Sequence, residues 1–97
     1  MMKEQKQKKV AIGKVMVKLG SLIENFRSDT GTTYDSLNQE TGLHYNTCKR
    51  IVEGCPTLQA QNLLLLLAEL MQRDRHGAAD RFFAAFRSLL DDAFDEN

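Results

Sequence analysis

Apolar side chains recur at helical spacing along most of the chain, after a polar beginning. Residues 1–9 are polar and lysine-rich without such spacing, and we expect them to form a flexible basic arm. From residue 10 onward, one apolar stripe predicts a helix, and its members are Val15, Leu19, Leu22, Ile23 and Phe26. Gly31 supplies a stop for this helix.

Four further helices are predicted downstream. Thr33 is a hydroxyl N-cap for a short helix that Gly42 interrupts, and a second short helix starts at residues 44–47 and ends at Gly54. The Pro-Thr pair at 56–57 opens the fourth helix, whose apolar residues are Leu58, Leu63, Leu66, Leu67 and Leu70. A polar break at 73–77 precedes the last helix, over residues 78–94. No long segment alternates with period two, so the predicted fold is all-α with five helices.

Composition fits one small globular domain. The chain has 97 residues, of which 42% are hydrophobic and 27% charged. Its longest apolar run, over residues 63–68, is far shorter than the roughly 18 residues that span a bilayer. The basic start lacks the apolar core of a secretory signal, so we expect no membrane association and a cytoplasmic, nucleoid-associated location.

Charge is unevenly distributed although the formal net charge is zero. Residues 1–54 carry a net +3 and residues 55–97 a net −3, with six lysines and one glutamate in residues 1–18. Such polarity lets a basic face meet a polyanion and keeps an acidic end away from it. Charged ends that serve only solubility produce the same pattern.

Residues 37–54 hold the pattern with the most functional information. A glycine at 42 permits a left-handed turn between two short helices, and Leu43 can fill the corner between them. If Cys48 and Ile51 turn inward, the second helix presents a polar stripe made of Tyr45, Asn46, Lys49, Arg50 and Glu53. In a major groove, Asn pairs with adenine and Arg with guanine, while Lys and Tyr contact phosphates.

With these residues the chain resembles the lambda-repressor-like (Cro/XRE-type) family of helix-turn-helix regulators. The resemblance covers residues 19–70, and its anchors are Leu22, Arg27, Thr33, Leu37, Gly42, Leu43, Thr47, Cys48, Arg50, Ile51, Gly54, Pro56, Thr57 and the leucines from 63 to 70. It implies a DNA-binding domain over residues 10–74. Residues 75–97 then add an amphipathic helix with an acidic tail. Asn38 departs from the Ala that the family prefers there, and Tyr34 from a common Gln.

The resemblance implies a homodimer that binds double-stranded DNA and represses transcription at a pseudo-palindromic operator, as phage, plasmid or mobile-element repressors do. The candidate DNA contacts are Thr33, Tyr34, His44, Tyr45, Asn46, Thr47, Lys49 and Arg50. Independently of the family, the lysines of the basic arm are candidates for phosphate or groove contacts, and they are Lys3, Lys6, Lys8 and Lys9. Solvated charges on a helix face are the alternative for Lys49 and Arg50.

The last helix has more apolar residues than one seam can bury. We expect Phe82, Phe86 and Leu89 to pack on the chain's own helices. The other flank, made of Phe83, Leu90 and Phe94, is expected to pack on a second subunit. In the rival arrangement, the whole helix folds onto the first and fourth helices.

Other chemistry has weaker support in the sequence. The four residues His44, Cys48, Cys55 and His76 match the ligand count of a structural zinc site, but not the spacing of a finger or ribbon, so no metal or cofactor is predicted. Catalytic motifs are missing, and we predict no enzyme. The alternative to a regulator is a protein-interaction module, such as an antitoxin, that binds a partner protein through its C-terminal helix.

Overall fold

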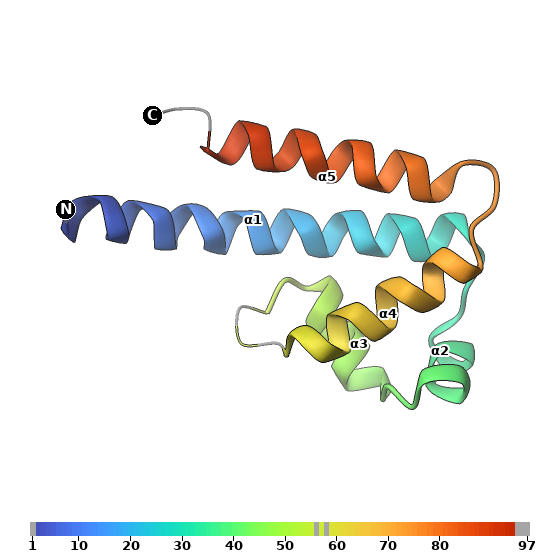
Figure 1. The fold of residues 1–97 in the computed structure, drawn as a ribbon. Helices are drawn as coiled ribbons and strands as arrows, with labels where there is room; N and C mark the ends of the chain where they lie inside the picture. The colour runs from blue at the N-terminus through green and yellow to red at the C-terminus, as the bar shows by residue number, and fades with distance from the viewer. Residues whose placement is uncertain (1, 56, 58, 95–97) are drawn as a thin grey trace.

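The computed structural model describes the backbone of residues 2–55, 57 and 59–94. Side chains are described for residues 12–55, 57 and 59–93. Its helices are α1 (Met2–Asp29), α2 (Tyr34–Thr41), α3 (Tyr45–Val52), α4 (Ala60–Gln72) and α5 (Ala78–Phe94). The described ranges contain no strand, which confirms the all-α prediction. In Figure 1, α5 runs antiparallel along α1, and α2, α3 and α4 lie on the other side of α1.

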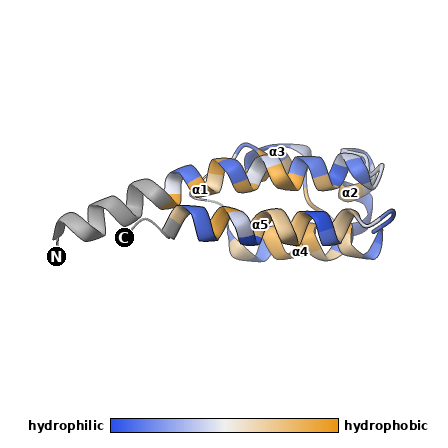
Figure 2. Ribbon diagram, turned by 90° about the horizontal axis from the view of Figure 1, so that it is seen from above, coloured by the Kyte–Doolittle hydropathy of each residue, from blue (hydrophilic) through white to orange (hydrophobic). Residues whose placement is uncertain are grey.

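The helices form two layers. Seen from above in Figure 2, α4 lies with α5 on one side, while α3 lies with α1 on the other. Since α4 and α5 face the viewer of Figure 1, α3 is behind α4 in that view. None of the described helices is long and apolar enough to cross a membrane.

Helix α1 begins at Met2, earlier than the start expected near residue 10, and it includes residues 2–9 of the expected basic arm. This stretch is made of Met, Lys, Glu and Gln, which are good helix formers, and it contains no glycine or proline. A helix can therefore continue there without an apolar stripe of its own. The side chains of Lys3, Lys6, Lys8 and Lys9 lie outside the described ones.

The fourth helix starts later than predicted. The extended backbone of Gln59 (φ −82°, ψ 136°) makes it the N-cap, so α4 begins at Ala60 rather than at the Pro-Thr pair. The first helical bonds follow from this, because the carbonyl of Gln59 accepts from the N–H groups of Asn62 and Leu63 at 3.1 and 3.3 Å. Pro56 and Leu58 lie outside the described residues.

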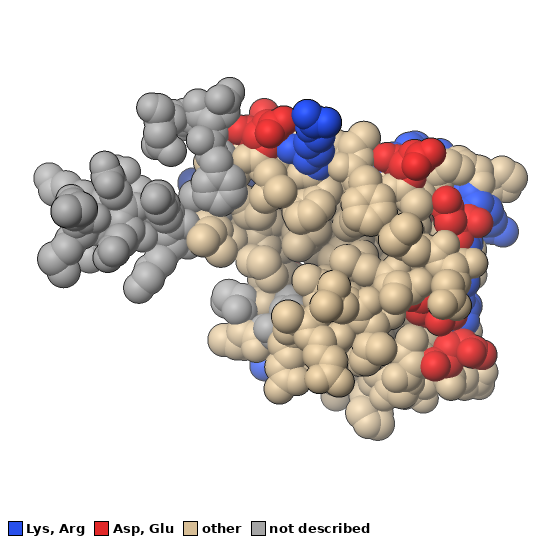
Figure 3. Space-filling view, in the orientation of Figure 1, with Lys and Arg blue, Asp and Glu red and all other residues tan. Residues whose placement is uncertain are grey.

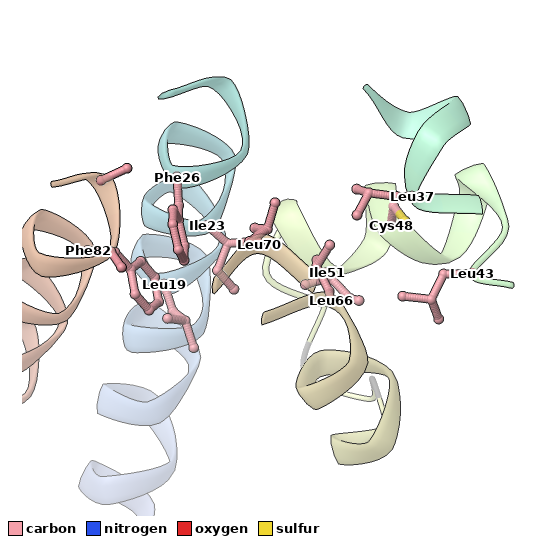
Figure 4. Packing of buried hydrophobic residues seen from close by; sticks show 12 residues of the cluster. Leu19, Ile23, Phe26, Leu37, Leu43, Cys48, Ile51, Leu66, Leu70 and Phe82 are labelled. Atoms are coloured by element: carbon pink, nitrogen blue, oxygen red, sulfur yellow. The ribbon is translucent and has the colours of Figure 1, made fainter. Parts of the chain in front are cut away.

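One hydrophobic core joins the two layers (Figure 4). Leu19, Ile23 and Phe26 of α1 meet α5 on one side and Leu66 and Leu70 of α4 on the other. The core extends into α2, the following turn and α3 through Leu37, Leu43, Cys48 and Ile51. Cys48 is fully buried, as expected, and this burial raises the pKa of its thiol.

The inward flank of α5 packs as predicted. Phe82 is buried and stacks on Phe26 with ring centroids 5.1 Å apart, and Phe86 and Leu89 pack partly buried against the core. Phe83 keeps 42% of its surface exposed and Leu90 37%. The side chain of Phe94, the third member of the predicted outward flank, lies outside the described ones.

Candidate nucleic-acid interface

Two capped ends define the first short helix. The Thr33 hydroxyl caps α2 by accepting from the N–H of Ser36 at 3.1 Å. At the other end, Gly42 adopts the left-handed conformation (φ 78°), and its N–H donates to the carbonyl of Asn38 at 2.8 Å. Only glycine takes this conformation at low cost, so the chain can reverse here within a few residues.

The turn after Gly42 is fixed by side chains on both sides. Leu43 is buried in the corner between α2 and α3, and its N–H donates to the Thr41 hydroxyl at 3.1 Å. The side-chain amide of Asn38 donates to the carbonyl of Leu43 at 3.0 Å. The departure from Ala at position 38 therefore brings a hydrogen bond across the turn instead of a clash between the helices.

The second short helix divides into a buried and an exposed side. Cys48 and Ile51 are buried, whereas Asn46 and Arg50 are exposed and Tyr45 keeps 55% of its surface exposed. At 100° per residue, the stripe that runs from Tyr45 to Glu53 and includes Asn46, Lys49 and Arg50 spans about 140° of the circumference. His44, the N-cap, is exposed at the start of the stripe, while Thr47 and Lys49 are half-buried. We call the set of Tyr45, Asn46, Lys49, Arg50 and Glu53 the α3 stripe.

Close backbone contacts hold α3 against α1. A Cβ atom on Gly54 would lie 2.5 Å from the Cα of Val17 and 2.6 Å from the carbonyl oxygen of Met16. One on Gly20 would lie 2.8 Å from the backbone nitrogen of Gly54. Because backbone rather than flexible side chains meets at these points, the position of α3 is fixed on a rigid support.

A polar cluster fixes the start of α2 and α3. The hydroxyl of Tyr34 donates to both carboxylate oxygens of Glu24, at 2.9 and 3.1 Å. Arg27 pairs with the same carboxylate, lies over the Tyr34 ring at 4.3 Å and donates to the carbonyl of Thr32 at 2.7 Å. The Tyr34 ring in turn meets Tyr45 edge-on, with centroids 5.2 Å apart. Tyr34 thus connects three helices.

The pKa values of this cluster follow from its geometry. Burial by itself would raise the pKa of Glu24, but hydrogen bonds from Arg27 and Tyr34 outweigh it, and the net pKa is lowered. Burial, reinforced by the hydrogen bond to Glu24, raises the pKa of Tyr34 to about 12. Tyr34 is half-buried and its hydroxyl is engaged, so it is placed to orient α2 and α3 rather than to reach a ligand.

The two cations of α3 have no carboxylate partner within the described residues. Arg27, Arg73 and Arg81 each form an ion pair, with Glu24, Glu69 and Asp29 respectively. Within the described residues, neither Lys49 nor Arg50 forms one. A site for a polyanion needs cations whose charge is not already compensated.

Two exposed lysines of α1 were not singled out by sequence reasoning. Lys14 and Lys18 are exposed on α1, and together with Gly13 and Val17 they line a shallow hollow. Val17 also contacts Gly54, so the lysines lie near the carboxyl end of α3. Their i, i+4 spacing was the available signal, since it predicts that both side chains share one helix face.

The remaining candidates are scattered. Among the described residues, no group of three or more His, Cys, Asp or Glu side chains is placed to hold a metal ion. Cys55 is partly exposed, and its hydrogen bond with Thr57 lowers the pKa of its thiol.

No protein-family model, curated protein or solved structure matches the chain.

Proposed function

We propose that the chain is a sequence-specific, double-stranded DNA-binding transcriptional regulator of the lambda-repressor-like helix-turn-helix type. The observation that carries this proposal is the α3 stripe, an exposed polar and basic face on a helix with a rigid support. An eight-residue helix is about 12 Å long and as wide as a major groove. The α2–turn–α3 unit, with its left-handed glycine and buried corner leucine, supports the same assignment.

The side chains divide into base readers and phosphate binders. Asn46 and Arg50 are exposed and carry the planar donor groups that pair bidentately with adenine and guanine. Lys49, Lys14 and Lys18 are suited to phosphates, because an ammonium acts as a point charge. Tyr34 is a positioning residue in this proposal. A repressor reading a pseudo-palindrome would place two copies of α3 in half-sites about 10 bp apart.

The first test is binding to DNA selected from a random duplex pool. Arg50→Ala is expected to weaken binding of the selected site by about 5- to 150-fold and to relax the preference at one base pair. Arg87→Ala is the matched control, since it removes the same charge from an exposed position on α5. Both variants are compared on a single half-site, so that the place of Arg87 beside Phe83 and Leu90 does not affect the result. Lys14→Ala should weaken all sequences alike and make the salt dependence shallower.

Failure has a clear form. If the pool yields no enriched sequence, or if Arg50→Ala and Arg87→Ala bind the selected site equally well, α3 does not read DNA. Binding that is weak, independent of sequence and lost with salt indicates a charged surface without base readout.

A protein-interaction module is the second candidate, and the exposure of Phe83 and Leu90 on α5 favours it. An antitoxin-like protein would combine this surface with DNA binding. The two functions separate in one experiment, because Phe83→Asp should abolish capture of a partner protein and leave binding of a DNA half-site intact.

A further inference from the structure

The outer side of α4 is apolar and has no partner within the described chain. Leu64 keeps 65% of its surface exposed and Met71 47%, and Ala68 lies between them on the same stripe. At 100° per residue this stripe is opposite Leu66 and Leu70, the residues that α4 buries in the core. Leu65 adds a further exposed side chain at its edge (38%).

The same side of the molecule carries the outward flank of α5. Figure 3, drawn in the orientation of Figure 1, shows uncharged atoms over the middle of the surface formed by α4 and α5, with charged atoms mainly at its upper and right edges. Glu69 is the only charged residue of α4, and Arg73 neutralises it. We call this surface the α4–α5 face, with Leu64, Leu65, Met71, Phe83 and Leu90 as its exposed large apolar residues.

We infer that the α4–α5 face is the surface on which a second copy of this chain docks, related by a two-fold axis. The sequence predicted a contribution from α5 alone, through Phe83, Leu90 and Phe94. The structure adds α4, whose Leu64 and Met71 are the most exposed of these five large apolar side chains.

The area of the face suits such a pairing. Its five large apolar side chains expose roughly 400 Å² in total, on the scale of the largest patch of a typical monomer. A stable interface covers about 800 Å² on each partner, of which somewhat more than half is apolar. The exposed apolar surface is therefore close to what one side of a stable dimer contributes.

Charge also favours the α4–α5 face over other parts of the surface for a contact between two copies. In a two-fold contact the same patch meets itself, so any charge near the axis faces a like charge. The α3 stripe, with Lys49 and Arg50, would repel itself, and so would the outer side of α5 at Asp91 and Asp92. On the α4–α5 face Glu69 is already paired with Arg73, and Arg87, which lies between Phe83 and Leu90 on α5, would have to lie away from the axis.

Pairing through this face leaves α3 accessible. The stripe with Leu64 and Met71 is on the opposite side of α4 from Leu66 and Leu70, and α3 lies behind α4 in Figure 1. A second copy seated on the α4–α5 face therefore does not cover the α3 stripe of either chain. The pairing needs no DNA, so it can be tested separately from the proposed function.

Sedimentation velocity of the full chain without DNA, from about 1 μM to about 100 μM, is the test. We expect the mass to rise from the 11.0 kDa of one chain to twice that value. Leu64→Glu and Met71→Glu should each raise the midpoint concentration about tenfold or more, because each places an unpaired carboxylate in an apolar contact. Gln39→Glu adds the same charge at an exposed position of α2 and should leave the midpoint unchanged.

Two further measurements keep the result unambiguous. Circular dichroism should show unchanged helix content in both variants, since Leu64 and Met71 lie at the surface. Raising the salt from about 0.1 M to about 0.5 M should leave the midpoint unchanged or lower it, whereas a dimer held by ion pairs would weaken.

A chain that stays monomeric over the whole concentration range overturns the inference, and the apolar face is then a binding surface for a different protein. Dimers that persist in the Leu64→Glu, Met71→Glu double variant overturn it as well, because they form elsewhere. Monomeric Leu64→Glu should still bind one DNA half-site. If Arg50→Ala loses DNA binding but still forms dimers, the result bears on the proposed function of α3 and not on the pairing.

Discussion

Two glycines with the same backbone angle allow the energetic effect of the close contact between α1 and α3 to be measured. Gly42 and Gly54 both have φ +78°, so alanine at either position is strained by about 1–2 kcal/mol. A Cβ on Gly42 would meet nothing within 4 Å, whereas one on Gly54 would meet the backbone of Val17 and Met16 at 2.5–2.6 Å. Backbone atoms cannot move aside cheaply, so overpacking should add about 1–3 kcal/mol at Gly54.

Gly42→Ala is therefore expected to lower the free energy of unfolding by about 1–2 kcal/mol, and Gly54→Ala by about 2–5 kcal/mol. Urea unfolding followed by the helical circular dichroism signal measures both, with equal m-values as the check that the same surface is exposed. Gly42→Asn is the control for the backbone term, because Asn tolerates the left-handed conformation better than Ala. Equal losses for the two alanine variants would refute the close approach of α3 to α1.

Two other predictions concern the core and the polar cluster. Phe82→Ala should cost about 3–5 kcal/mol of unfolding free energy in the same urea assay, since Phe82 is buried against Phe26. Phe83→Ala should cost about 1–2 kcal/mol, since Phe83 keeps 42% of its surface exposed and meets only the edge of the Phe82 ring. Equal losses would contradict the assignment of the two α5 flanks. Because the folded-state pKa of Tyr34 is about 12, above its ordinary value of 10.0, its contribution to stability is complete below pH 10 and is lost as the pH rises towards 12. In an absorbance titration at alkaline pH, the tyrosinate of Tyr34 should form only as the pH approaches 12. Glu24→Gln should move this ionisation to lower pH, and Tyr34→Phe should remove it. An ionisation near pH 10 that disappears in Tyr34→Phe would be inconsistent with the hydrogen bond to Glu24.

Local signals predicted the later helices well. The range 78–94 matches α5, because its apolar spacing and the glycine before it mark both ends. The turn at Gly42 and the burial of Leu37, Cys48 and Ile51 also follow from spacing and from the conformational freedom of one residue. Membership of the lambda-repressor-like helix-turn-helix family stays a prediction, since no comparison tests it.

Features that depend on distant partners were missed. Tyr34 was expected to face a ligand, but its hydroxyl binds Glu24, ten residues earlier, and a periodicity argument cannot see that pairing. The role of Gly20 as a contact point for α3 is equally hidden, because an interior glycine looks like a weak point of a helix. The early start of α1 was missed because apolar spacing, not helix propensity, was used to place it.

The antiparallel contact between α1 and α5 has a consequence for the order of events during synthesis. Phe26 stacks on Phe82, so the helix made first is covered by the one made after all the other described helices. More than half of the chain separates the two rings, and at about 5–20 residues per second that interval lasts on the order of several seconds. Over that time the side of α1 that faces α5 stays open to chaperones and to other nascent chains. A chain that stops before residue 78 lacks the ring that stacks on Phe26.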